Sequence, residues 1–130
     1  MKTSLADKWF SLFIRLRDAD ENGMAACITC GRVKLVKYMD CGHYVKRQHP
    51  SRFNEKCCAA QCKKCNKFGQ GEDVIFRQKL VELYGEDAVL LLEAGKRQIV
   101  HMPGWKLKLI ADEYKEKARK LSKEKGIELW

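Results

Sequence analysis

Two Cys-x-x-Cys pairs, Cys27–Cys30 and Cys62–Cys65, are separated by 31 residues and constrain the fold of this chain more than any other feature. Two residues between thiols let both sulfurs reach one metal ion at about 2.3 Å, and two such pairs complete a tetrahedral shell. A closed shell of four thiolates is typical of structural zinc, so we expect one Zn²⁺ per chain, held by Cys27, Cys30, Cys62 and Cys65. The alternative is a redox role for the pairs, although a redox pair rarely occurs twice in one chain.

The remaining cysteines also argue against a disulfide framework. The chain has seven cysteines in 130 residues, which is an odd number, and its first ten residues carry charges where a signal peptide needs an apolar segment. We therefore expect a cytoplasmic protein with reduced thiols. We interpret Cys41, Cys57 and Cys58 as small buried side chains. A second metal site built from Cys41, Cys57 and His43 stays open as an alternative, without support from spacing.

Positive charge is concentrated in the middle of the chain. The formal net charge is +9, and residues 32–67 alone hold ten Lys and Arg against two Asp and Glu. This surplus favours a polyanionic partner, most often a nucleic acid. The same surplus is compatible with a solvated basic face or with another anion. No apolar run in the sequence approaches the roughly 18–20 residues that a membrane span requires. The predicted phosphate contacts are Lys46, Arg47, Arg52, Lys63, Lys64 and Lys67.

The pattern along the chain predicts a single α+β domain over residues 1–130. An N-terminal helix is expected within residues 1–22, where Ser4 and Asp7 form a weak capping box before an apolar face. Residues 24–70 lack a helical period and include strand-like runs such as residues 32–39, so they form the expected zinc-bound core. Residues 71–130 return to helical patterns, one ending at Gly85, a second at Gly95 and a third running through the basic C-terminal segment.

Several motifs together resemble a known family. Cys-x-x-Cys, then Gly42-His43-Tyr44, then Cys-x-x-Cys-Asn resembles the HNH, or His-Me finger, nucleases with a zinc-bound ββα fold. Additional similarity to the NinG (Rap) recombination family of phage lambda lies in these segments: residues 5–8, 14–18, 52–55, 60–66, 111–114 and Trp105. The resemblance covers roughly residues 5–121. It implies a small ββα core between an N-terminal helix and C-terminal helices, in a phage protein of the bacterial host cytoplasm.

The resemblance also implies an activity, namely metal-dependent cleavage of branched DNA such as Holliday junctions or flaps. His43 would be the general base that takes a proton from the attacking water, and Asn66 would bind a divalent ion such as Mg²⁺. Asp40 is the nearest carboxylate for a second ligand position. DNA is the expected partner, a homodimer would suit a symmetric junction, and no small-molecule cofactor is expected.

The chain departs from the HNH pattern at two positions. Gly42 stands where many members have an aspartate before the histidine, and Cys57 stands where the central asparagine is usual. These departures keep a second reading open, a non-catalytic zinc-ribbon protein that binds DNA in phage recombination or replication. A third reading is a zinc scaffold for protein partners, with the basic C-terminal helix as the docking surface.

Overall fold

The computed structural model describes residues 4–45, 50–69, 72–94, 98 and 100–130. Four helices and two antiparallel strand pairs make it an α+β fold, as the sequence predicts. The helices are α1 (Leu5–Asp18), α2 (Asp73–Tyr84), α3 (Glu86–Glu93) and α4 (Gly104–Lys125), and short helical turns span η1 (Val36–Tyr38), η2 (Glu55–Cys57) and η3 (Lys64–Phe68). The strands are β1 (Met24–Ala26), β2 (Val33–Leu35), β3 (Asp40–His43) and β4 (Cys58–Gln61).

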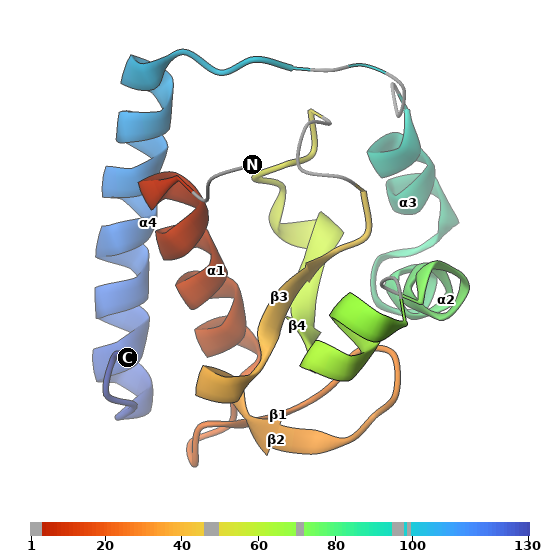
Figure 1. The fold of residues 1–130 in the computed structure, drawn as a ribbon, viewed down its shortest axis with the longest axis horizontal. Coiled ribbons are helices and arrows are strands. Elements are labelled where there is room, and N and C mark those ends of the chain that lie inside the picture. The colour runs from red at the N-terminus through yellow and green to blue at the C-terminus, as the bar shows by residue number, and fades with distance from the viewer. Residues whose placement is uncertain (1–3, 46–49, 70–71, 95–97, 99) are drawn as a thin grey trace.

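Helix α1 lies at the centre of the molecule, between α4 on one side and the β3–β4 pair on the other (Figure 1). The predicted capping box is confirmed, because the Ser4 hydroxyl accepts the Asp7 N–H and the Asp7 carboxylate accepts the Ser4 N–H. The expected apolar face is confirmed at Leu12 and Leu16, which pack with Ala118 of α4. A second face is buried as well, since α1 has neighbours on two sides.

Both strand pairs are antiparallel, and β3 carries Asp40 and His43. In β3–β4, Asp40 is paired with Gln61 and His43 with Cys58. In β1–β2, Met24 is paired with Leu35 and Ala26 with Val33. The strand expected over residues 32–39 is correct only for Val33–Leu35, because the backbone then turns into η1, where the Met39 N–H donates to the Val36 carbonyl. This turn redirects the chain into β3.

The main core lies between the second face of α1, the β3–β4 pair and the helices α2 and α3. Phe10, Ile14, Phe76, Leu80 and Val89 are among its fully buried side chains. Gly85, with a φ of +91°, joins α2 to α3, as the sequence predicts for a helix end. The predicted end of α3 at Gly95 lies outside the described residues.

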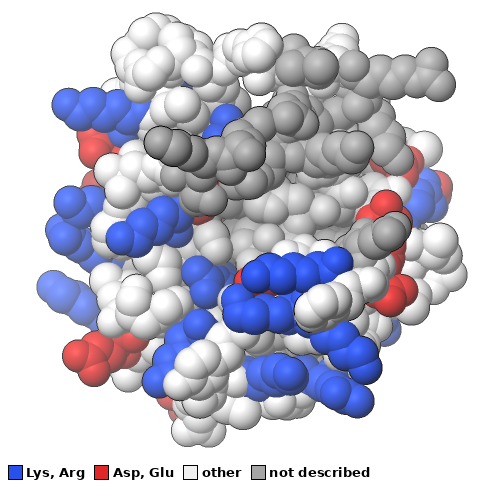
Figure 2. Space-filling view, viewed as in Figure 1, with Lys and Arg blue, Asp and Glu red and all other residues white. Residues whose placement is uncertain are grey.

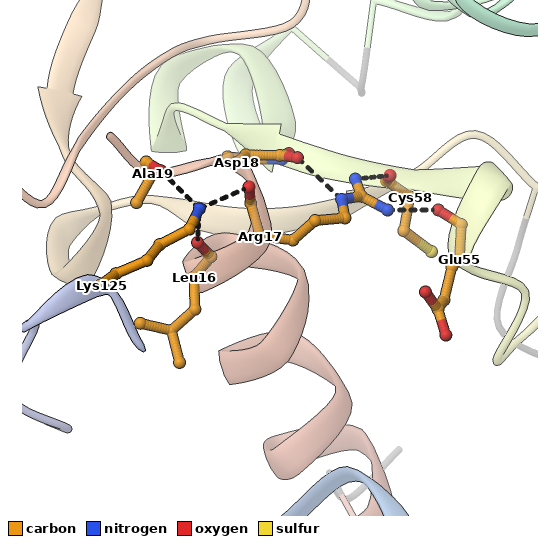
Figure 3. Close-up of polar contacts among 8 residues, drawn as sticks. Leu16, Arg17, Asp18, Ala19, Glu55, Cys58 and Lys125 are labelled. Carbon is orange, nitrogen blue, oxygen red and sulfur yellow. Dashed lines mark hydrogen bonds and ion pairs between the residues drawn. The ribbon is translucent and has the colours of Figure 1, made fainter. Parts of the chain in front are cut away.

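The C-terminal end of α1 is fixed by two basic side chains (Figure 3). The Lys125 ammonium group at the end of α4 donates to the carbonyl oxygens of Leu16, Arg17 and Ala19, at 2.8, 2.9 and 2.7 Å. The Arg17 guanidinium donates to the carbonyl oxygens of Glu55 and Cys58 at 2.7 and 2.8 Å. These bonds tie α1 to α4 and to the start of β4, and so fix one side of the strand pair that carries His43. No helix in the described part of the chain is long and apolar enough to cross a membrane.

Candidate functional site

The four cysteines of the two Cys-x-x-Cys pairs converge into one cluster, as the sequence predicts. Cys27 and Cys30 lie in the turn between β1 and β2, Cys62 follows β4 directly, and Cys65 lies in η3. All four sulfurs lie within 4.8 Å of one another, and those of Cys30 and Cys62 are 3.8 Å apart. A tetrahedron with metal–sulfur bonds of about 2.3 Å has edges of about 3.8 Å, so the spacing fits one zinc ion.

Within this four-cysteine cluster the backbone favours a thiolate at Cys27, whereas burial and the neighbouring cysteines raise the pKa of Cys30 and Cys65. The N–H groups of Cys62 and Cys65 donate to the sulfurs of Cys27 and Cys62, at 3.3 and 3.4 Å. Burial raises the pKa of Cys27, but backbone N–H groups and the Thr29 hydroxyl outweigh it and lower that pKa to about 6. Gly31 closes the turn with a φ of +77°, a left-handed conformation that favours glycine. The cluster could therefore hold a metal such as zinc, and its closed soft-ligand shell suits a structural ion.

A second site lies on the other side of β3. It is a cavity of about 430 Å³, lined by Asp7, Ser11, Asp40, Cys41, His43, Asn66 and Lys67. The three predicted catalytic residues, His43, Asp40 and Asn66, therefore share one cavity although they come from β3 and η3. Asn66 follows Cys65 of the four-cysteine cluster, so a metal in this cluster would fix η3 against the β1–β2 turn and the end of β4.

Hydrogen bonds position the Asp40 carboxylate within this cavity. The Asn66 amide nitrogen donates to one Asp40 oxygen at 3.0 Å, and the Lys63 ammonium group donates to the other at 2.7 Å. Burial alone would raise the pKa of Asp40, but these two donors outweigh it and lower the pKa below its ordinary value. The site therefore contains an ionised carboxylate beside an amide, and these are the oxygen donors that hard divalent cations prefer.

The comparisons with known proteins fall in one family. The family model of the bacteriophage lambda NinG protein matches residues 3–124. The chain belongs to the NinG family. It is 32% identical over 121 residues to protein ninG of Escherichia phage lambda and to protein ninG of Salmonella phage P22, covering 89% of this chain and 55% of each relative. Over 92 residues it is 33% identical to protein ninG of Escherichia phage 933W, covering 69% of this chain and 43% of the relative. The chain thus spans about half the length of these curated relatives, and no solved structure matches it.

Gly42, the first departure of this NinG-family chain from the HNH pattern, has a steric cause. A Cβ atom at position 42 would lie 2.3 Å from the Gln61 side-chain oxygen and 3.0 Å from its Cβ. Gln61 is fully buried, and its amide nitrogen donates to the Thr29 hydroxyl at 3.1 Å. Position 42 is therefore filled from the opposite strand and has no room for an aspartate.

Cys57, the second departure, holds the segment that follows His43. Its sulfur accepts the Val45 N–H at 3.4 Å, and its carbonyl accepts the Tyr44 N–H at 2.9 Å. The Cys57 side chain is fully buried among the residues of the main core. A sulfur atom therefore accepts a hydrogen bond that ties the segment after His43 to η2, directly before β4.

The predicted phosphate-contacting residues differ in their surroundings. Lys46 and Arg47 lie outside the described residues. Lys67 is exposed and lines the cavity, Lys64 is exposed on η3, and Lys63 is exposed but paired with Asp40. Figure 2 shows basic side chains along α4 and around the lower centre of this face.

Arg52 has a structural role that the sequence analysis did not predict. Its guanidinium group forms a two-bond ion pair with Asp7, with one bond of 3.1 Å, and its side chain is only 13% exposed. Burial raises the pKa of Asp7, but the bonds from Arg52 and Ser4 outweigh it, so the net pKa is lowered. The ion pair with Asp7 therefore leaves little of the Arg52 side chain available for contact with DNA.

Two cavity residues were missed by the sequence analysis. Asp7 and Ser11 come from α1, one helical turn apart, and line the cavity with His43. Their spacing of four residues places them on one helix face, which is a usable signal. The capping box explains Asp7 at the start of α1 and gives no indication that the same side chain also lines the cavity.

Proposed function

We propose that this NinG-family chain is a metal-dependent DNA endonuclease that acts on branched recombination intermediates, such as Holliday junctions or flaps. The observation that carries the proposal is the shared cavity of His43, Asp40 and Asn66, with Lys67 at its margin. A base, an ionised carboxylate, an amide and a cation are the groups that phosphodiester hydrolysis uses. The order β3, β4 and η3 supports an HNH-type ββα core, with His43 at the end of its first strand.

In this proposal His43 acts as the general base. A neutral imidazole accepts a proton from water at pH values near 7, and its side chain lines the cavity where a phosphate would enter. The ladder pair with Cys58 fixes the backbone of His43, and the Phe10 ring lies 6.3 Å from the imidazole ring. The imidazole is therefore held by a strand and a core aromatic residue rather than by a free loop.

Asp40 and Asn66 are the residues that would hold a hard divalent cation. Such an ion, when bound, would neutralise charge on the scissile phosphate and the leaving oxygen. In this structure the Asn66 amide donates its nitrogen to Asp40, so the amide would have to rotate to present its oxygen to a cation held by Asp40. Lys63 neutralises Asp40 in this structure and would have to share the carboxylate with the cation.

Basic side chains around the cavity supply the proposed contacts to DNA. Lys64 and Lys67 are exposed on η3, within the segment of highest positive charge. Phosphate contacts of this kind position DNA without reading its sequence, which suits recognition of a branched shape. A four-way junction has two strands to cut, so we propose that two copies of the chain act on one junction.

A cleavage assay on defined substrates tests the proposal. Linear duplex, single strands, a flap and a four-way junction would be incubated with the protein, each with and without Mg²⁺. We expect Mg²⁺-dependent cleavage of the branched substrates, lost in His43→Ala and retained in His101→Ala, since His101 is an exposed histidine outside the cavity. Wild-type protein that cuts none of these substrates contradicts the proposal.

Gly42 and Cys57 favour one other candidate function, a zinc-dependent DNA-binding protein without cleavage. Neither residue offers the oxygen ligand or amide of the HNH pattern. Tight binding to branched DNA with no cleavage in any metal would support this candidate. Failure to bind any DNA at moderate salt would favour a zinc scaffold for protein partners.

A further inference from the structure

Three metal-binding side chains outside the four-cysteine cluster lie together on one face of the β3–β4 pair. Cys41 and His43 alternate along β3, so they point to the same face, and Cys58 is the ladder partner of His43. Their ligand atoms, two sulfurs and one imidazole nitrogen, all lie within 4.8 Å of one another. Cys58, rather than Cys57, completes this group, because its sulfur lies within 4.8 Å of both other ligand atoms.

The donor set selects a thiophilic cation. Two sulfurs and one imidazole are ligands for Zn²⁺ and related metals, whereas Mg²⁺ takes oxygen ligands. Binding of Zn²⁺ would replace the two thiol protons, which leave to solvent. The resulting group of two thiolates, one neutral imidazole and one dication has no net charge. A neutral group is compatible with the burial of Cys58, which is 1% exposed.

The position of the group leaves one coordination site open. Cys41 and His43 line the cavity, whereas Cys58 lies beneath them in the core. Three protein ligands from below leave the fourth position of a tetrahedral ion on the cavity side, where Asp40 and Asn66 also lie. Zinc sites with two Cys ligands, one His ligand and an open fourth position bind water or substrate there.

We propose that Cys41, His43 and Cys58 form a second metal site, for a thiophilic cation such as Zn²⁺, and that its occupation inhibits cleavage. The two sites share no residue, so the second is independent of the four-cysteine cluster. The inhibitory part rests on the proposed function, because an imidazole nitrogen that donates its lone pair to a metal cannot accept a proton from water. The site would thus make an Mg²⁺-dependent enzyme sensitive to free Zn²⁺.

Metal titration tests the binding part. Reduced protein carrying one Zn²⁺ in its four-cysteine cluster would be titrated with Co²⁺, followed by sulfur-to-cobalt charge-transfer absorption. We expect one further equivalent of Co²⁺ in the wild type. Cys41→Ser, at a half-buried position, should weaken this binding about tenfold or more. Cys57→Ser is the matched control, since Cys57 lies outside the group, and should still bind the second ion.

Two outcomes would overturn the second site. One is wild-type protein that takes up no Co²⁺ beyond the four-cysteine cluster, and the other is Cys41→Ser with the same titration as the wild type. Circular dichroism and melting temperature would establish that each variant is folded. Should Cys41→Ser unfold, Cys58→Ala under the same titration gives the decision.

Cleavage at saturating Mg²⁺ tests the inhibitory part. We expect added Zn²⁺ to stop cleavage of a four-way junction by the wild type. Inhibition of Cys41→Ser should require about tenfold more Zn²⁺. The rate of each protein is expressed relative to its own rate without Zn²⁺. Equal inhibition of both proteins, or stimulation by Zn²⁺, would overturn this part. If the protein binds Co²⁺ at the second site but cleaves no substrate, the proposed nuclease activity is wrong and the second metal site stands. If the protein cleaves DNA but binds no second Co²⁺, the second metal site is wrong and the nuclease activity stands.

Discussion

The sulfurs of Cys30 and Cys62 lie 3.8 Å apart although 31 residues separate them in the chain. This contact joins the β1–β2 turn to the start of η3, the turn that carries Asn66. The four-cysteine cluster and the cavity are therefore coupled through the backbone between Cys62 and Asn66. A metal in the cluster would hold η3, which forms one wall of the cavity, against the β1–β2 turn and the end of β4, so its loss should affect both folding and cleavage.

We predict that the protein binds one structural zinc through the four-cysteine cluster. Structural zinc contributes on the order of 10 kcal/mol to the folding of small domains, so Cys62→Ser should lose the metal and unfold at ordinary temperatures. Elemental analysis and thermal melting give the measurement, with Cys57→Ser as the cysteine control. A folded Cys62→Ser protein with an unchanged melting temperature would show that the cluster is not a structural metal site.

The residues of this cluster could be predicted from the sequence because ligand spacing is local within each pair. Each Cys-x-x-Cys pair forms a chelating turn by itself, and only the meeting of the two turns depends on the tertiary structure. The roles of His43 and Asn66 were implied by the resemblance, and both residues line the cavity. Helix α1 was predicted with one apolar face, whereas Phe10 and Ile14 are buried on another. A central helix with neighbours on two sides has no single stripe, so its periodicity reports only part of its contacts.

The remaining surprises are long-range. Nothing local in the sequence indicates that Arg52 pairs with Asp7, because 45 residues separate them. The local sequence likewise does not show that Gln61 fills the space opposite Gly42, which depends on strand register. Both relationships arise from which segments meet in the fold. The charge of Arg52 suggested a DNA contact, while its burial made it a structural residue.

The roles of His43 and Asn66 predict two different defects. His43→Ala should lower the cleavage rate by about 10² to 10⁴, the usual contribution of a general base, and should preserve the zinc of the four-cysteine cluster and DNA binding. Asn66→Ala should instead raise the Mg²⁺ concentration required for half-maximal activity. Rates measured over a Mg²⁺ series distinguish these effects. His43→Ala cutting at the wild-type rate would contradict the assignment, and unfolding with loss of zinc from the four-cysteine cluster would make His43 structural.

Cys57 should contribute stability through its sulfur. Cys57→Ala removes the acceptor of the buried Val45 N–H and opens a small void, which should lower the free energy of unfolding by about 1–3 kcal/mol. Cys57→Ser keeps a small acceptor and should lose less, and Cys57→Asn should leave cleavage equal or raise it if its amide also holds the His43 segment. Urea denaturation and cleavage rates provide the comparison. A fall in cleavage in folded Cys57→Asn would show that packing of the sulfur matters more than the hydrogen bond.

Arg52 and Lys67 should separate stability from DNA binding. Arg52→Ala leaves the Asp7 carboxylate buried without its cation and should lower the free energy of unfolding by about 3 kcal/mol at neutral pH. The folded pKa of Asp7 lies below its ordinary value of 3.8. The contribution of the ion pair to the free energy of unfolding is therefore fully present above pH 3.8 and is lost as the pH falls through the folded pKa of Asp7. Below that pH the free energies of unfolding of the wild type and Arg52→Ala should converge.

Lys67→Ala should show the opposite pattern, with unchanged stability and weaker binding to all DNA sequences. Its salt dependence, as the slope of log affinity against log salt concentration, should fall by about 1. Binding measured by fluorescence anisotropy at several salt concentrations gives this slope. If Arg52→Ala has the stability of the wild type and a smaller slope of log affinity against log salt concentration, Arg52 contacts DNA.

Lys125 should be the most important lysine of α4 for stability. Its ammonium group satisfies three carbonyl oxygens at the C-terminal end of α1, where the helix dipole also favours a cation. Lys125→Met keeps the aliphatic stem but removes these charge-assisted bonds, which should lower the free energy of unfolding by about 1.5–3 kcal/mol. Lys123→Met, two residues earlier at an exposed position, should change it by less than about 0.5 kcal/mol. Equal melting temperatures for the two variants would mean that the end of α1 is satisfied by water as well as by Lys125.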